Sequence, residues 1–276
     1  MTVITISNFK GGVGKTTFAT ILAYLLQKQG KKVGLIDFDP QANATEIMFN
    51  TFNMDSNVKT SLFEAIQEED LLKCVVKANS ELDIFPSDLD LVGFPAHLYD
   101  LTSDKTKRFY LLKYLIDQIK EDYDYIIIDV PPTISEFTNN AIVASDYVAL
   151  IMQTHQQSFA SSVKFIEYLK DLLDYNENIK LAGVIPYLVT KKGKVDNEVL
   201  EDSKKIFSDH LFNSQIMKRE RIKLFSKNGI TNEDMHDKAV LDMYQSVVNE
   251  LIERIGKEWA LKILTQMSLD LENQIL

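Results

Sequence analysis

The sequence predicts an α/β protein with one doubly wound, mostly parallel sheet and helices on both of its faces. Its expected strands are short apolar runs without alternation, the pattern of strands that are covered on both sides. Residues 2–37 follow the order strand, glycine-rich turn, helix, strand, which is a βαβ crossover and implies parallel strands. The same alternation continues along the chain without a Pro/Ser-rich linker or a detectable repeat.

The first unit shows why each element is expected. Residues 2–7 form an apolar run that is ended by a polar residue and then by a glycine pair. Residues 16–29 repeat apolar side chains at helical spacing, and a glycine follows as a natural stop. Residues 32–37, KVGLID, form a second apolar run that ends in an acid.

The rest of the chain is divided by the same criteria. Apolar runs predict strands at residues 82–85, 125–129, 147–152, 181–189 and near 212–217. Amphipathic spacing predicts helices at residues 107–120, 162–173, 198–210, 238–254 and 258–274. The polar segment 43–60 is expected to be a mobile loop. We expect residues 1–276 to form a single domain that ends in C-terminal helices at about 238–276.

Composition places the chain among folded soluble proteins, with 45% hydrophobic and 25% charged residues. The single cysteine, Cys74, cannot form an internal disulfide or a cysteine-rich metal site. No signal-peptide pattern opens the sequence, and no apolar run approaches the ~20 residues of a membrane span, so we expect a cytoplasmic protein. The net charge of −10 argues against a surface of positive potential throughout, and any DNA binding must come from a local basic patch.

The strongest functional motif is NFKGGVGKTT at residues 8–17. Its glycines allow the backbone to curl so that several N–H groups face one anion, and the following helix adds its positive N-terminal end. Lys15 can reach the β- and γ-phosphates of a nucleotide, and the Thr16 hydroxyl can bind Mg²⁺. A strand before and a helix after are the context that this motif requires. The sequence therefore predicts a P-loop NTPase fold that binds Mg-ATP.

The motif departs from the common G-x-x-x-x-G-K-[ST] pattern at one place. Phe9 stands where that pattern has glycine, and the loop carries an additional lysine, Lys10. KGGVGKTT thereby resembles the deviant phosphate loop of the ParA/MinD superfamily. The resemblance implies that Lys10 reaches across a nucleotide-sandwich dimer and stabilises charge at the partner subunit's phosphates. The ATP-binding residues that it implies are Lys10, Gly11, Gly12, Val13, Gly14, Lys15, Thr16 and Thr17.

Two strand-end motifs supply carboxylates for the same site. Asp37 and Asp39 stand in the run DFDPQ, where an acid at the carboxyl end of a strand can reach the nucleotide. Asp129 ends the run YIIID before a Pro-Pro pair, a Walker B pattern whose acid binds Mg²⁺ through water. Both runs are similar to ParA-type motifs, which implies that Asp39 positions the attacking water and that Asp37 supports the loop. The expected catalytic residues are Lys10, Lys15 and Asp39, and the expected metal-binding residues are Thr16, Asp39 and Asp129.

A local reversal of charge marks the candidate DNA contact. The segment 215–227, QIMKRERIKLFSK, has a single acid, and its basic residues are Lys218, Arg219, Arg221, Lys223 and Lys227. ParA-type proteins bind DNA through the corresponding region when ATP holds them as dimers, and such phosphate contacts are blind to sequence and sensitive to salt. Dimerisation would bring two patches together and strengthen binding. The alternative interpretation is an ordinary solvated helix face.

The resemblance implies an ATPase for plasmid or chromosome partition, with ATP and Mg²⁺ as cofactors. ATP would close a homodimer that binds double-stranded DNA without sequence preference, and a centromere-binding, ParB-like adaptor would stimulate an otherwise weak hydrolysis. Because the sequence begins at the first strand, we expect site-specific DNA binding to fall to that adaptor. The expected location is the cytoplasm, at the nucleoid when ATP is bound, with no membrane partner.

Other members of this superfamily offer alternative functions. A MinD-like membrane switch ends in a basic amphipathic helix, whereas residues 267–276 carry acids and no Lys or Arg, and anionic lipid repels them. A nitrogenase-reductase-like protein needs bridging cysteines that Cys74 alone cannot supply, and a tyrosine autokinase would have a Tyr-rich tail. An ATP-dependent metabolic ligase stays open because substrate pockets carry no readable motif.

Overall fold

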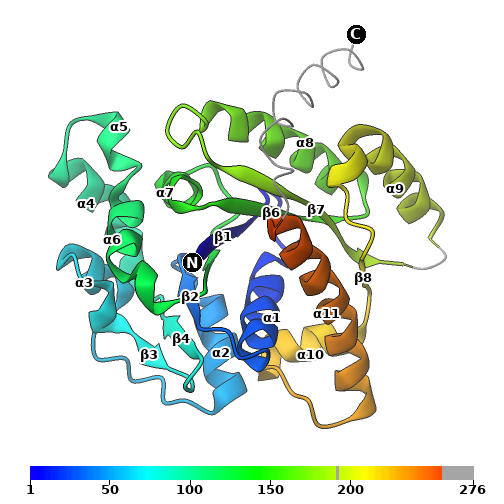
Figure 1. The fold of residues 1–276 in the computed structure, drawn as a ribbon, viewed down its shortest axis with the longest axis horizontal. Helices are drawn as coiled ribbons and strands as arrows, with labels where there is room; N and C mark the ends of the chain where they lie inside the picture. Colours follow the sequence, from blue (N-terminus) through cyan, green and yellow to red (C-terminus); the bar gives the residue numbers. More distant parts are fainter. Residues whose placement is uncertain (191–192, 257–276) are drawn as a thin grey trace.

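The computed structural model describes residues 1–190 and 193–256, and one eight-stranded sheet forms its centre (Figure 1). The strands are β1 Thr2–Ser7, β2 Val33–Asp37, β3 Val76–Lys77, β4 Leu82–Phe85, β5 Tyr125–Asp129, β6 Tyr147–Gln153, β7 Lys180–Val189 and β8 Ile216–Met217. Their order is β3-β4-β2-β5-β1-β6-β7-β8, and only the β3–β4 pair is antiparallel. The predicted mostly parallel sheet is confirmed.

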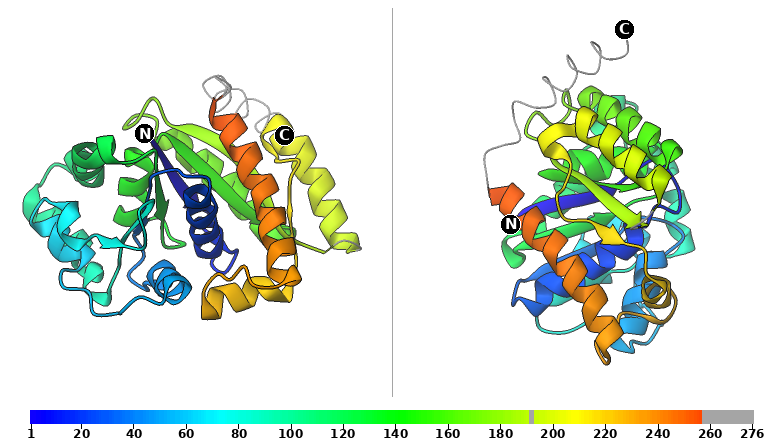
Figure 2. Two further views of the ribbon diagram at one scale, coloured as in Figure 1. Left: turned by 60° about the horizontal axis from the view of Figure 1, so that its bottom comes forward. Right: turned by 90° about the vertical axis from the view of Figure 1, so that its right-hand side faces the viewer.

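Helices cover both faces of this sheet, as the doubly wound prediction required (Figures 1 and 2). The first face is covered by α1 Lys15–Lys28, α2 Asn43–Phe52, α10 Glu220–Asn228 and α11 Met235–Gly256. The second face carries α3 Leu62–Gln67, α4 Phe94–Leu101, α5 Lys105–Arg108, α6 Leu111–Ile119, α7 Glu136–Ala144, α8 Gln156–Asp171 and α9 Lys194–Phe207. Short 3-10 turns lie at Leu71–Cys74, Leu89–Gly93, Lys120–Asp122 and Ser208–His210.

Alternate residues of the central strands face the two helical layers, as the period of a strand requires. Ile4 and Ile127 belong to the core beneath α1, whereas their neighbours Val3, Ile126 and Ile128 belong to the core on the opposite face. Both faces are therefore apolar along the same strand, which explains why these runs show no alternation in the sequence.

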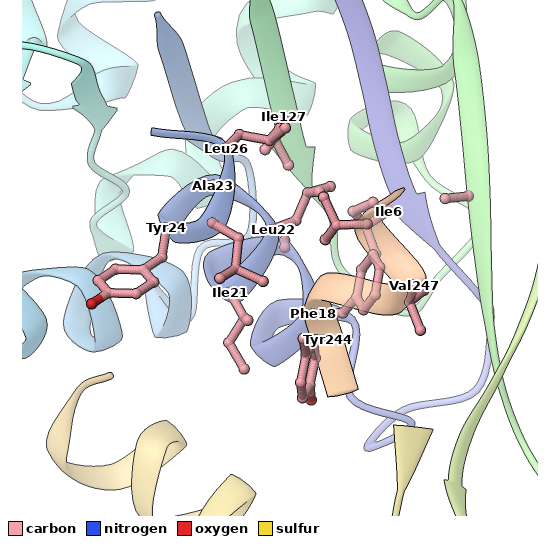
Figure 3. Close-up of a cluster of buried hydrophobic side chains, with 14 of the residues drawn as sticks. Ile6, Phe18, Ile21, Leu22, Ala23, Tyr24, Leu26, Ile127, Tyr244 and Val247 are labelled. Atoms are coloured by element: carbon pink, nitrogen blue, oxygen red, sulfur yellow. The ribbon is translucent and has the colours of Figure 1, made fainter. Parts of the chain in front are cut away.

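Helix α1 is held against the sheet along most of its length. Figure 3 shows Leu22 beside the strand residue Ile6, and Phe18 between Ile6 and the α11 residues Tyr244 and Val247. All five side chains are fully buried, and each such apolar side chain contributes roughly 1.5–3 kcal/mol. This packing fixes the N-terminal end of α1, which faces the edge of the sheet where the phosphate loop lies.

The prediction of a mobile loop at 43–60 is wrong in its first half, where α2 occupies Asn43–Phe52. The segment is polar in composition, but the buried Ala44, Ile47 and Met48 recur at helical spacing, and Ile47, Met48 and Phe49 join the core of α1. A count of polar residues misses this amphipathic face, because helix formation depends on where the apolar residues lie.

Other element boundaries differ from those predicted. Helix α8 begins at Gln156 rather than at residue 162, because His155 caps it by accepting the N–H of Ser158 at Nδ1. Helix α9 begins at Lys194 rather than at residue 198, and α7 was not predicted. The predicted helix 258–274 and the acidic segment 267–276 lie outside the described residues.

Among the helices of the described ranges, none is both long enough and apolar enough to span a membrane.

Candidate nucleotide site

The carboxyl ends of β1, β2 and β5 meet at one edge of the sheet. Strand β5 lies between the other two, so Asp129 pairs in register with Ile6 on one side and with Asp37 on the other. The phosphate loop leaves β1 at this edge and enters α1 at Lys15. The sheet order thus brings together three motifs that are far apart in the sequence.

A cleft of about 440 Å³ opens at this edge. It is lined by Gly12, Gly14, Lys15, Thr16, Thr17, Asp39, Gln41, Asn43, Glu46, Ile47, Val130, Pro132 and Ser226. The predicted phosphate loop and the predicted Asp39 therefore share one cavity. Sequence reasoning missed the contributions of α2 and of Ser226 in α10, which no local motif marks.

The backbone of the loop has the shape that an anion site requires. Gly12 and Gly14 have φ angles of 72° and 100°, in the left-handed region that favours glycine. A Cβ atom at Gly14 would lie 2.2 Å from the ring of Tyr187, so the close approach also demands glycine. No side chain caps this end of α1 in the described residues. The residues of its first turn line the cleft, so their N–H groups are available to bind an anion there.

Two side chains that sequence reasoning missed hold the loop in place. The Asn8 amide donates to the carbonyl of Ile151 at 2.8 Å and accepts the N–H of Lys10 at 2.9 Å. The Gln153 amide donates to the carbonyl of Gly12 at 3.0 Å. Asn8 is the first residue of the motif and its role could have been inferred, whereas Gln153 comes from β6 and has no local signal.

Lys15 and Asp129 form the buried centre of the site. The Lys15 side chain is 6% exposed, and this burial lowers its pKa, although the carboxylates of Asp129 and Asp39 oppose the shift. Asp129 is fully buried, and neither carboxylate oxygen has a hydrogen bond of ordinary geometry within the described residues. Burial, and then the charge of Asp37, raises the pKa of Asp129 to about 8, while the nearby Thr16 hydroxyl lowers it. A buried acid whose oxygens have no hydrogen bond of ordinary geometry fits a site whose ligand brings a cation.

The two acids after β2 have different environments. Asp37 is buried and accepts both the N–H and the hydroxyl of Thr45 at 2.8 Å, so it fixes the first turn of α2. Its support of the loop stays a prediction. Burial raises the pKa of Asp37 to about 6. Asp39 is half-buried on the wall of the cleft, and its Oδ1 accepts the N–H of Gln41 at 3.0 Å. Asp39 is thus the acid of this pair that a nucleotide in the cleft could contact.

Lys10 lies beside the loop on its own subunit in this structure. The side chain is half-exposed, and Nζ donates to Oε1 of Gln157 at 3.3 Å in the first turn of α8. Its role across a dimer stays a prediction.

The predicted DNA-binding residues lie in the link after β8, which holds Lys218 and Arg219, and in α10. They are not equivalent. The Arg221 guanidinium forms ion pairs with the buried Asp237, at 3.1 Å, and with Asp234, both near the start of α11. The remaining basic residues are exposed: Lys218, Arg219, Lys223 and Lys227. Lys223 lies 3.2 Å from Glu220 in an exposed pair, which is worth little. DNA contact stays a prediction for all five residues, and the four exposed ones are the better placed.

Replacing Asp129 with asparagine is expected to stabilise the nucleotide-free protein at alkaline pH. An acid whose pKa is raised on folding contributes stability below its unfolded pKa near 4, and that stability is lost as the pH rises through about 8. At pH 8 in EDTA, urea denaturation should show a gain of about 1–3 kcal/mol in the free energy of unfolding. The exposed substitution Asp122→Asn is the control, and a less stable Asp129→Asn protein at pH 8 would contradict this view of the site.

The fold and the site together define a P-loop nucleotide-binding protein: a glycine-rich loop between β1 and α1, with an acid at the end of the adjacent β5. The AAA_31 family model, described as an AAA domain, matches residues 1–182. The chain belongs to this family and is a ParA-type ATPase of the ParA/MinD superfamily.

Relatives in sequence include proteins named for chromosome partition and sporulation. The sporulation initiation inhibitor protein Soj of Bacillus subtilis is 30% identical over 80% of this chain and 85% of its own length. The chromosome partitioning protein ParA of Caulobacter vibrioides is 29% identical over 80% of this chain and 82% of its own.

Solved structures show the same fold. A putative plasmid partition protein of Borrelia burgdorferi bound to AMPPNP has a TM-score of 0.74 at 27% identity, covering 92% of this chain and 98% of its own. Apo McdA of Cyanthece has a TM-score of 0.78 at 24% identity, covering 93% of this chain and 100% of its own. Cobyrinic acid a,c-diamide synthase of Mycobacterium smegmatis with ADP and magnesium has a TM-score of 0.75 at 23% identity, covering 92% and 95%. The last two likenesses concern the fold alone.

Proposed function

We propose that residues 1–276 act as one ATP-hydrolysing unit that partitions DNA, either a plasmid or a chromosome. The observation that carries the proposal is the position of α10. This helix lines the nucleotide cleft through Ser226 and carries Lys223 and Lys227 on its exposed side. A single helix therefore joins the site that would bind ATP to the surface that would bind DNA. The names of the partition relatives support the same function.

The residues of the cleft fit Mg-ATP. The loop N–H groups and the Lys15 ammonium would bind the phosphates, while Thr16, Asp129 and Asp39 would hold the Mg²⁺ shell. When bound, Mg²⁺ neutralises charge on the phosphate oxygens. Asp39, on the wall of the cleft, would orient the attacking water and accept its proton. Lys10 of a second copy would add positive charge to the phosphates in an ATP-bound homodimer.

DNA binding would follow from the same dimer. Two basic segments side by side would contact the phosphates of double-stranded DNA without reading its sequence, and this would place the ATP-bound protein at the nucleoid. The chain carries a net charge of −10, so such binding depends on the local patch rather than on the whole surface. A centromere-binding, ParB-like adaptor would stimulate hydrolysis and so release the dimer.

The double substitution Lys223→Ala/Lys227→Ala tests the basic segment. With saturating ATP, we expect the affinity for a random-sequence duplex to fall about tenfold or more, because phosphate contacts dominate such binding. The slope of log K against log[salt] should become shallower by about one unit for each DNA phosphate that the variant no longer neutralises. Fluorescence anisotropy over a series of salt concentrations measures both quantities.

The double substitution Lys204→Ala/Lys205→Ala is the matched control. It makes the same change of charge at the end of another helix, α9, where both lysines are exposed. Equal DNA affinities for the two double variants would refute the assignment of α10 as the DNA contact.

A further inference from the structure

A row of hydroxyl groups joins the phosphate loop to the basic helix α10. The Thr17 and Ser226 hydroxyls are hydrogen-bonded at 2.8 Å, and Ser226 Oγ also lies 3.1 Å from the carbonyl oxygen of Ile222. The Tyr187 hydroxyl interacts with Thr17 and is hydrogen-bonded to the hydroxyl of Tyr244. The row therefore runs from α11 through β7 and α1 to α10, and its Thr17 and Ser226 line the nucleotide cleft.

Helix α10 rests on the two helices that line this cleft. Its last turn is tied to α1 by the Thr17–Ser226 hydrogen bond. Just after the helix ends, Ile230 donates its N–H to Thr51 Oγ1 of α2 at 2.8 Å. Gly229 permits this approach, since a Cβ atom there would lie 2.5 Å from the Thr51 nitrogen. Figure 2 shows α10 lying between α2 and α11 at the foot of α1. The helices that line the cleft therefore touch the helix that carries the basic side chains, so a movement in the cleft can reach α10 directly.

The number of protons restricts how these hydroxyls can be arranged. Each hydroxyl has one proton to donate and two lone pairs to accept. Without a nucleotide, Thr17 can donate to Ser226, and Ser226 can donate to the carbonyl of Ile222. A phosphate at the N-terminus of α1 accepts hydrogen bonds from the first turn, and Thr17 lines the cleft there. Once Thr17 donates to the phosphate it cannot also donate to Ser226, so the Thr17–Ser226 hydrogen bond is kept only if Ser226 turns its proton to Thr17 and releases Ile222.

We propose that Ser226 is a positioning residue that couples nucleotide occupancy to α10. Phosphate binding reverses the Thr17–Ser226 hydrogen bond and removes the bond from Ser226 to the carbonyl four residues earlier. Back-bonding of this kind bends helices, so its loss changes the course of α10 and the direction of Lys223 and Lys227. This inference rests on the proposed function, because it concerns the regulation of the proposed DNA-binding segment.

Hydrogen–deuterium exchange over residues 220–230, measured with and without Mg-AMPPNP, tests the coupling directly. In the parent protein the nucleotide should change amide protection in this segment. Ser226→Ala should abolish that change, and Ser226→Thr, which keeps the hydroxyl, should retain most of it. DNA affinity is measured in parallel with and without saturating ATP, and the ATP-dependent gain in affinity should fall about tenfold in Ser226→Ala, equivalent to 1.4 kcal/mol.

Ser246→Ala is the matched control, because Ser246 is exposed on α11 and makes the same bond to the carbonyl four residues earlier, that of Asp242. It should behave as the parent does. The coupling would be overturned, even if the protein binds DNA, by either of two results. The nucleotide could leave amide protection over residues 220–230 of the parent unchanged, or it could change that protection equally in Ser226→Ala and in the parent. A parent protein that binds no DNA but still shows the Ser226-dependent change in exchange would refute the proposed function and support the coupling.

Discussion

Replacing Lys15 with alanine is expected to abolish ATP binding. The Lys15 ammonium is buried at the phosphate loop, where the charges of Asp129 and Asp39 surround it. Its loss removes the cation that meets the phosphates and leaves those carboxylates to repel them. Truncating one partner of a buried, hydrogen-bonded charge pair costs about 2–5 kcal/mol of binding free energy, which corresponds to a Kd weaker by about thirtyfold or more.

Isothermal titration calorimetry with ATP and Mg²⁺ measures this loss. Lys28→Ala is the matched control, since it makes the same substitution in the same helix, where the side chain is exposed and lies over the Tyr24 ring. Lys28→Ala should bind ATP as the parent does. A Kd for Lys15→Ala within about threefold of the parent value would show that the phosphates are held elsewhere.

Replacing Asp39 with alanine is expected to separate binding from turnover. Asp39 lies on the wall of the cleft and takes no part in the phosphate loop, so the loop and Lys15 should still bind ATP. Removing a negative charge near Lys15 also lowers the repulsion that the phosphates meet. Hydrolysis should fall about 10²- to 10⁴-fold, the usual contribution of a group that accepts a proton from the nucleophile.

Single-turnover hydrolysis at saturating ATP measures the chemical step, and gel filtration with ATP reports the dimer. The exposed acid Asp55, replaced by alanine in the same way, provides the control for a simple loss of charge. Hydrolysis by Asp39→Ala at the parental rate would remove Asp39 from the catalytic residues. Loss of ATP binding in this variant would instead assign it to binding.

The elements nearest the motifs could be predicted from the sequence. Strand β1, the phosphate loop, α1 and β2 follow each other within 37 residues, and each one carries its own local signal. The apolar run of β5 likewise predicts both the strand and the acid at its end. The order of the strands could not be predicted, because it depends on contacts between distant segments. That order places Asp129 between Ile6 and Asp37.

Contacts at long range also account for the parts of the site that the sequence did not indicate. Gln153 and Ser226 reach the loop from β6 and α10, and nothing in their neighbours marks them. By charge alone, the five basic residues of 215–227 are equivalent candidates for DNA contact. The structure distinguishes Arg221, because Asp237 in α11 pairs with it.

The measurement that tests the central claim most directly is binding of the parent protein to a random-sequence DNA duplex. It compares ATP, ADP and no nucleotide, each at a low and a high salt concentration. We predict tight binding with ATP alone, and a steep loss of affinity at high salt because phosphate contacts carry the binding. Absence of DNA binding in every nucleotide state would contradict the partition function. A MinD-like membrane switch and an ATP-dependent ligase on the same fold would then be the functions to test.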